Sequence, residues 1–203
     1  DGLKQYADQR FSGLGAQVNF AGSGNNSYVW ADLLITSQAQ SILFSKIGIL
    51  LLATIMFRSV RLGFYVIVPV TLTTLVIAGV CGVIGIPLDV STALAAGVAI
   101  GVGVDYAIHY IFRYLRERQA GVGHLDATQA TLRAVGKTII SSAMVVTAGF
   151  LVLLFSNFPP HVKLGVFVAA YMVVSCVTAI LILPVMFSLV RNDAELFEMR
   201  RAT

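Results

Sequence analysis

A single carboxylate stands in the middle of a long apolar stretch of this sequence. It belongs to Asp105, which Tyr106 follows directly, and His109 comes one helical turn later on the same face. A lone carboxylate at the centre of a bilayer costs about 2.5–3.5 kcal/mol, so it needs a partner, a water-filled cavity or a proton. We therefore predict that Asp105 is a proton-relay acid. The alternative is an aspartate held by hydrogen bonds between helices.

The two neighbours of this acid have chemistry that suits a relay. The Tyr106 phenol can hydrogen-bond a carboxylate or a water chain, and an imidazole such as that of His109 titrates at physiological pH. Both residues also have simpler interpretations. Tyr106 can be an interfacial packing residue, and His109 can be a helix-end residue in contact with water.

One further charge interrupts an apolar run and could serve as a charge partner of the acid. Lys46 precedes Arg58 by about 18 Å of helix, which places it within one side-chain length of the depth of Asp105. An ion pair between Lys46 and Asp105 would oppose protonation of the acid. The interpretation we favour is that Lys46 extends its ammonium group to the outer surface and leaves Asp105 free.

Small residues precede the acid at helical spacing. Ala93, Gly97 and Gly101 recur every fourth residue, and Gly103 lies close behind them. Such a stripe lets a second helix approach closely. We expect Gly97, Gly101 and Gly103 to be helix-packing residues.

The composition indicates which solvent surrounds these residues. Hydrophobic residues make up 57% of the 203 residues and charged residues 12%, against about 45–50% and about 25% in soluble domains. This excludes an ordinary soluble domain and a disordered chain. The apolar runs predict an all-α membrane protein, with a cytoplasmic amphipathic helix over about 124–136. The five expected transmembrane helices cover about 33–57, 62–84, 91–115, 138–156 and 162–190.

The basic residues predict the orientation of these spans. They form three clusters, each following an apolar run, which is typical of cytoplasmic loops. We therefore expect a multi-pass protein of the inner (cytoplasmic) membrane with residues 1–30 outside and the tail, 192–203, in the cytoplasm. This distribution argues against nucleic acid as a partner despite a net charge of +4. The clusters are Arg58 and Arg61; Arg113, Arg116, Arg118, Arg133 and Lys137; and Arg191, Arg200 and Arg201.

The N-terminal stretch differs from the rest of the chain. Residues 1–30 are polar and rich in glycine, with one short alternating strand expected over 16–21. We interpret them as the end of an extracytoplasmic domain, and the chain, which begins with Asp, as a piece of a longer protein. The sequence has no phosphate-binding Gly-Lys-Ser/Thr loop, no zinc-ligand spacing and no paired acids. We expect no enzymatic residue, cofactor or metal.

Several motifs together resemble a known family. The run Gly101-Val-Gly-Val-Asp-Tyr-Ala-Ile-His109, continued by Arg113-Tyr-Leu-Arg-Glu-Arg118, resembles the fourth transmembrane helix of the resistance-nodulation-division (RND) superfamily in its MMPL-type predicted-exporter branch. Phe57-Arg-Ser-Val-Arg61 and the segment Thr147 to Pro160 agree with it. The resemblance extends over most of residues 35–190.

The resemblance implies a half-unit of a proton-driven exporter with a bundle like that of sterol-sensing domains. Such a half has six transmembrane helices, with a large outer α/β porter domain between the first two. This chain would hold the end of that domain, a short remnant, and helices two to six. The family's Asp-Tyr pair corresponds to Asp105 and Tyr106, and its downstream His to His109.

The partners implied are the lipid bilayer, a hydrophobic or lipid-like substrate, and the missing porter domain and other transmembrane half of the same protein. A homo-oligomer is one option for its assembly. The main alternative function is a lipid- or sterol-sensing regulatory bundle that does not pump. A SecD/SecF-type translocation subunit shares the fold but matches the Asp105 helix poorly, and a structural anchor does not explain the acid.

Overall fold

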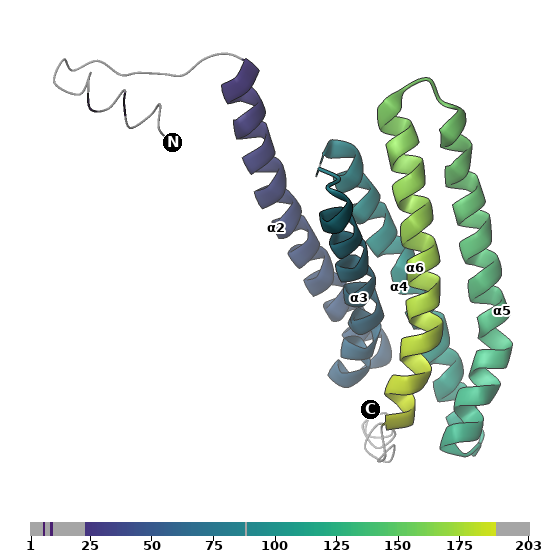
Figure 1. The fold of residues 1–203 in the computed structure, drawn as a ribbon. Coiled ribbons are helices and arrows are strands. Elements are labelled where there is room, and N and C mark those ends of the chain that lie inside the picture. The colour runs from purple at the N-terminus through teal and green to yellow at the C-terminus, as the bar shows by residue number, and fades with distance from the viewer. Residues whose placement is uncertain (1–5, 7–8, 10–22, 88, 190–203) are drawn as a thin grey trace.

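The fold is a bundle of long helices (Figure 1). The computed structural model describes Tyr6, Gln9, residues 23–87 and residues 89–189. Over these residues it contains five helices long and apolar enough to cross a membrane, and no strand. The all-α class predicted from the sequence is confirmed. The bounds are Ser23–Phe57 (α2), Val60–Ile84 (α3), Val90–Gln119 (α4), His124–Leu151 (α5) with a 3-10 extension over Val152–Phe155 (η2), and Pro159–Leu189 (α6).

Two helices are longer than the sequence patterns indicate. Helix α2 begins at Ser23, inside the stretch interpreted as outer domain, because extending a helix costs less than starting one. Helix α5 joins the expected amphipathic helix and the following span, since Gly136 alone does not stop a helix. The strand expected over 16–21 and the tail 192–203 lie outside the described residues.

A glycine and a capping aspartate form the connection between α3 and α4. Gly85 ends α3 in the left-handed conformation, with φ 74°. Asp89 caps α4: its carboxylate accepts a hydrogen bond from the Thr92 N–H at 2.9 Å, and its own N–H donates to the Thr92 hydroxyl at 2.8 Å. Lys163, near the start of α6, donates to the same carboxylate at 2.7 Å. This ion pair joins the ends of α4 and α6.

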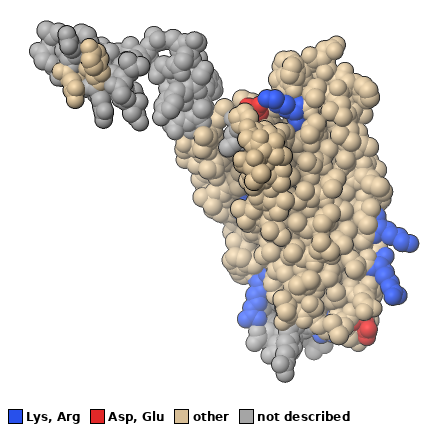
Figure 2. All heavy atoms as spheres, in the orientation of Figure 1, with Lys and Arg blue, Asp and Glu red and all other residues tan. Residues whose placement is uncertain are grey.

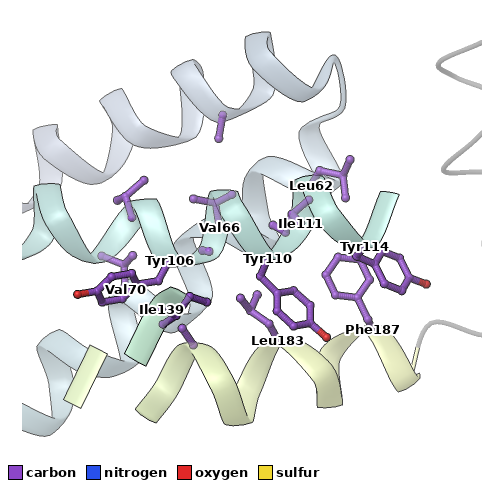
Figure 3. Packing of buried hydrophobic residues seen from close by; sticks show 14 of the residues in the cluster. Leu62, Val66, Val70, Tyr106, Tyr110, Ile111, Tyr114, Ile139, Leu183 and Phe187 are labelled. Carbon is purple, nitrogen blue, oxygen red and sulfur yellow. The ribbon is translucent and has the colours of Figure 1, made fainter. Parts of the chain in front are cut away.

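Helices α4 and α6 supply most of the core. In Figure 1, α2 leans away from the other helices towards its N-terminal end, and α5 lies at the opposite edge of the bundle. Aromatic rings of α3, α4 and α6 meet near one end, where the Phe187 ring lies 4.2 Å from Tyr114 and 5.2 Å from Tyr65 between centroids. Figure 3 shows Tyr110, Tyr114 and Phe187 in this cluster. These contacts fix α4 against α6.

Glycines allow the backbones to approach at specific points. A Cβ at Gly103 of α4 would lie 2.7 Å from the Ser175 hydroxyl oxygen of α6, and one at Gly165 of α6 would lie 2.5 Å from the Phe150 carbonyl oxygen of α5. In a bilayer, where lipid is as apolar as the helices, such close packing is a main source of helix association.

The outer surface suits an apolar solvent. On the face shown in Figure 2, charged side chains lie near the upper end and over the lower half of the bundle, with an uncharged band between them. Large side chains on this surface stay exposed, for example Leu52 and Val145. The described helices therefore present apolar side chains where the acyl chains of a bilayer would lie.

The Asp89 ion pair predicts an acid-sensitive contribution to stability. Burial alone would raise the pKa of Asp89, but the hydrogen bonds from Lys163 and from the Thr92 N–H outweigh it and hold the pKa below its usual value. Such a carboxyl stabilises the fold above its unfolded pKa of about 3.9 and loses this contribution as the pH falls through the folded value. We expect the melting temperature of the full-length protein in detergent to fall more below about pH 4 than that of Asp89→Asn. Equal pH dependence in both proteins would contradict this.

The close approach of α6 to α5 predicts a large effect of one methyl group. Gly165→Ala places its Cβ against the Phe150 carbonyl, so the backbones must separate, and we expect a loss of about 1–3 kcal/mol. Gly149→Ala is the matched control, because no atom lies within 4 Å of its Cβ position. Thermal unfolding of the full-length protein in detergent measures both. A Gly165→Ala protein as stable as Gly149→Ala would show that the helices separate there at no cost.

Candidate functional site

Helix α4 carries the predicted site residues, and it has two different faces. One face, which we call the open face, consists of Gly97, Gly101, Asp105 and His109, spaced four residues apart. All four residues are exposed, and no atom lies within 4 Å of a Cβ placed at Gly97 or Gly101. The open face has no packing partner at these glycines among the described residues.

The opposite face of α4 packs into the bundle. Tyr106 is only 2% exposed, and its hydroxyl donates a weak hydrogen bond to the Met172 sulfur of α6 at 3.8 Å. Gly103 lies against Ser175 of the same helix. Figure 3 shows Tyr106 in the core cluster with Tyr110. The phenol therefore points into the protein.

The structure thus separates residues that are adjacent in the sequence. It places Asp105 and His109 together on the open face, as their spacing predicts, and it places Tyr106 on the buried side, because successive residues of a helix are turned by about 100°. The three glycines are divided in the same way. Gly103 packs closely against α6, whereas Gly97 and Gly101 do not contact a described helix at their Cβ positions.

The surroundings of Asp105 are its most informative property. Its carboxylate makes no hydrogen bond and no ion pair with another residue of the described ranges. It lies about two turns inside α4 from Arg113, on the order of 12 Å along the axis, within the membrane-length helix Val90–Gln119. A carboxylate at that depth lacks the water that would solvate it on a soluble protein.

Lys46 does not pair with this acid in the structure. It lies half-buried on α2, and no ion pair within 4 Å joins it to Asp105. The geometry leaves the Asp105 carboxylate without a cation among the side chains that the structure describes.

The end of α4 beyond the acid is held by polar contacts. Arg113 forms an ion pair with Glu117 one turn later. The Tyr114 hydroxyl and the His124 Nδ1 are 2.7 Å apart, which ties α4 to the start of α5. The spacing of Tyr114 and His124 in the sequence does not predict this second contact, because the path of the loop between the two helices cannot be inferred from the sequence.

Two apolar cavities lie beside α2. One, of ≈ 420 Å³, lies between α2 and α4 and includes Gly97; the other, of ≈ 430 Å³, is lined by side chains of α2, α3, α4 and α6. Gln38 of α2 lines both cavities, and its side-chain amide donates a hydrogen bond to the Ala93 carbonyl of α4 at 3.3 Å. Their volumes are in the range of small-molecule sites.

The described side chains offer no metal site. No group of three or more His, Cys, Asp or Glu residues comes together within the ranges that the structure covers.

The sequence is similar to proteins named as membrane or transport proteins. A protein named "Putative membrane protein MJ1562" from Methanocaldococcus jannaschii is 28% identical over 151 residues, which are 74% of this chain and 39% of the relative. "Probable transport protein MmpL12" of Mycobacterium tuberculosis, from strains CDC 1551 / Oshkosh and H37Rv, is 32% identical over 94 residues, which are 46% of this chain and 8% of the relative. The chain spans less than half the length of each relative.

The match to a family model covers all of residues 1–203, including the five helices and the acid of α4. The model describes the MMPL family, which is the family that the residues around Asp105 resemble. The chain belongs to the MMPL family.

Proposed function

We propose that this chain is the transmembrane part of an exporter of hydrophobic or amphipathic substrates, lipids or drugs, driven by the proton-motive force. Membership of the MMPL family and a relative named as a transport protein support a role in membrane transport. The observation that carries the finer proposal is the unpaired Asp105 carboxylate on the open face of a membrane-spanning helix.

An unpaired carboxylate on that face needs a polar neighbour. Exposed to lipid it would cost about 2.5–3.5 kcal/mol, whereas a second helix, internal water or a proton removes the cost. Gly101, with no atom within 4 Å of its Cβ position, leaves room for such a helix to approach α4, whereas Gly97 lies beside the cavity between α2 and α4. The proposed occupant is the other transmembrane half of the same protein, because the chain spans only part of its relatives.

In the proposed mechanism, protonation of Asp105 from the outer side removes a charge from this interface. The interface between the halves then repacks, and release of the proton to the inside resets it. Substrate export follows if the two arrangements are coupled to movement of the porter domain. His109, one turn nearer the basic end of α4, is the next group for the proton on the same face.

Tyr106 acts in this mechanism from the buried side. Its hydroxyl donates to the Met172 sulfur, a weak acceptor, and the Ser142 side chain of α5 is a second hydrogen-bond partner. It would support the relay from that side by holding α4 against α6 while Asp105 on the open face changes its protonation state.

The topology completes the proposal. Residues 1–30 would be the end of the outer porter domain. The end of α4 that carries Arg116 and Arg118 would face the cytoplasm, as would the arginines that follow α2 and α6 in the sequence, as the positive-inside rule requires. The host membrane would be the cell's inner membrane. Lys46 would extend towards the outer surface and would not neutralise the acid.

The test of this function is a substitution that keeps the shape of the acid and removes its charge. Asp105→Asn in the full-length protein should reduce protonophore-sensitive export of the lipophilic dye Nile red to the level of cells without the protein, because the relay loses its titratable group. Asp105→Glu should retain part of it. Asp126→Asn, an exposed acid in the first turn of α5, is the matched control. Wild-type export by Asp105→Asn would refute the proposal.

The cavities beside α2 favour a second candidate, a lipid- or sterol-binding regulatory bundle that does not pump. Under that function Gly97→Leu, which adds a side chain to the cavity between α2 and α4, should abolish labelling of the full-length protein by a photoactivatable sterol, while Asp105→Asn should leave it intact. Export that depends on Asp105 but not on Gly97 would exclude this candidate.

A further inference from the structure

A cavity unlike the two apolar ones lies at the basic end of α4. Its volume is ≈ 590 Å³, and it lies between α4 and α5 where both helices leave the apolar band. Its lining combines charged, polar and apolar side chains. Those used below are His109, Phe112, Arg113, Arg116, Gln119 and Thr138.

The two arginines of this lining have unused hydrogen-bond donors. The exposed Arg116 side chain forms no hydrogen bond or ion pair with another residue of the described ranges. Arg113 gives one terminal nitrogen to Glu117, while its Nε is buried without a hydrogen-bond partner. A buried donor without a partner is costly, so a ligand that accepts hydrogen bonds would stabilise the site.

The charge of the cavity favours an anion. No carboxylate is among the residues that line it. Glu117 neutralises at most one of the two guanidinium groups, and Asp105 lies about two turns deeper in the helix. One positive charge therefore remains uncompensated at the mouth of the cavity.

The geometry of these groups suits a phosphate. Guanidinium groups bind phosphate oxygens through paired, charge-assisted hydrogen bonds. The Gln119 amide and the Thr138 hydroxyl supply further neutral donors in the same lining. Phe112, 44% exposed, adds an apolar surface beside the charged one. A lining that is cationic at one end and apolar at the other matches a lipid better than a free inorganic ion.

The position of the cavity agrees with a lipid. Both arginines follow the apolar part of α4 directly, so they lie at the level of the headgroups, where basic pockets between transmembrane helices attract anionic lipids. In the topology proposed above this is the cytoplasmic leaflet. The inference itself holds for either orientation and does not depend on transport.

We propose that this cavity binds the phosphate group of an anionic membrane lipid through Arg113 and Arg116, with Phe112 against the start of an acyl chain. The lipid fills the angle between α4 and α5 one turn beyond His109. It thereby occupies the end of the open face that carries Asp105.

The test counts bound lipids on the full-length protein, purified in a neutral detergent, by native mass spectrometry. Phosphatidylglycerol is titrated against phosphatidylcholine, and a third arm adds millimolar inorganic phosphate. Arg116→Gln should raise the apparent Kd for phosphatidylglycerol about fivefold, the effect of one interfacial basic residue. Arg116→Lys, which keeps the charge, should retain most of the binding.

Arg133→Gln is the matched control, because Arg133 is exposed on α5 and does not line the cavity. It should leave the Kd nearly unchanged. Equal binding by wild type and Arg116→Gln, or an equal loss in Arg133→Gln, would overturn the proposal. Binding of inorganic phosphate with the same dependence on Arg116 would overturn the lipid assignment and identify a free-phosphate site. Circular dichroism and size-exclusion profiles matching wild type show that the variants are folded.

Discussion

The close approach of Gly103 to Ser175 fixes how α4 is turned about its own axis. A Cβ at Gly103 would lie 2.7 Å from the Ser175 hydroxyl oxygen, so the glycine leaves space for that hydroxyl between α4 and α6 and marks the face of α4 that meets α6. Asp105 is two residues further along, a rotation of about 200°, and must therefore point away from α6. Tyr106, at about 300°, returns to the buried side. This one contact sets the division of α4 into an open and a buried face.

That division changes what an acid and a tyrosine in adjacent positions can do. A carboxylate buried between α4 and α6 would be satisfied by hydrogen bonds and would have only a structural role. On the open face it has no partner among the described residues, so its energy depends on whatever covers the face. Because the free energy of the charged carboxylate depends on the residues that cover this face, a change in its protonation changes the stability of that interface. Proton coupling requires such a link.

The sequence predicts the helices well and their rotations poorly. The apolar runs predict the five spans, and the four-residue spacing predicts the shared face of Asp105 and His109. Spacing cannot tell which face of a helix is covered, because that depends on the neighbours chosen by packing. For this reason Gly97 and Gly101, expected to pack like Gly103, lie on the open face. The sequence does not predict the cavity at Arg116 for the same reason, since side chains of both α4 and α5 line it.

The packing also limits how the proposed coupling can work. Gly103 and the aromatic contacts of Tyr110 and Tyr114 with Phe187 hold α4 to α6 along much of their length, with the Asp89 to Lys163 ion pair at the other end. Rotation of α4 alone would break all of these contacts at once. A movement of α4 and α6 together against a partner on the open face breaks none of them. Under the proposed relay, protonation of Asp105 would shift the two helices as one body, and the interface that repacks would be the one that Asp105 faces.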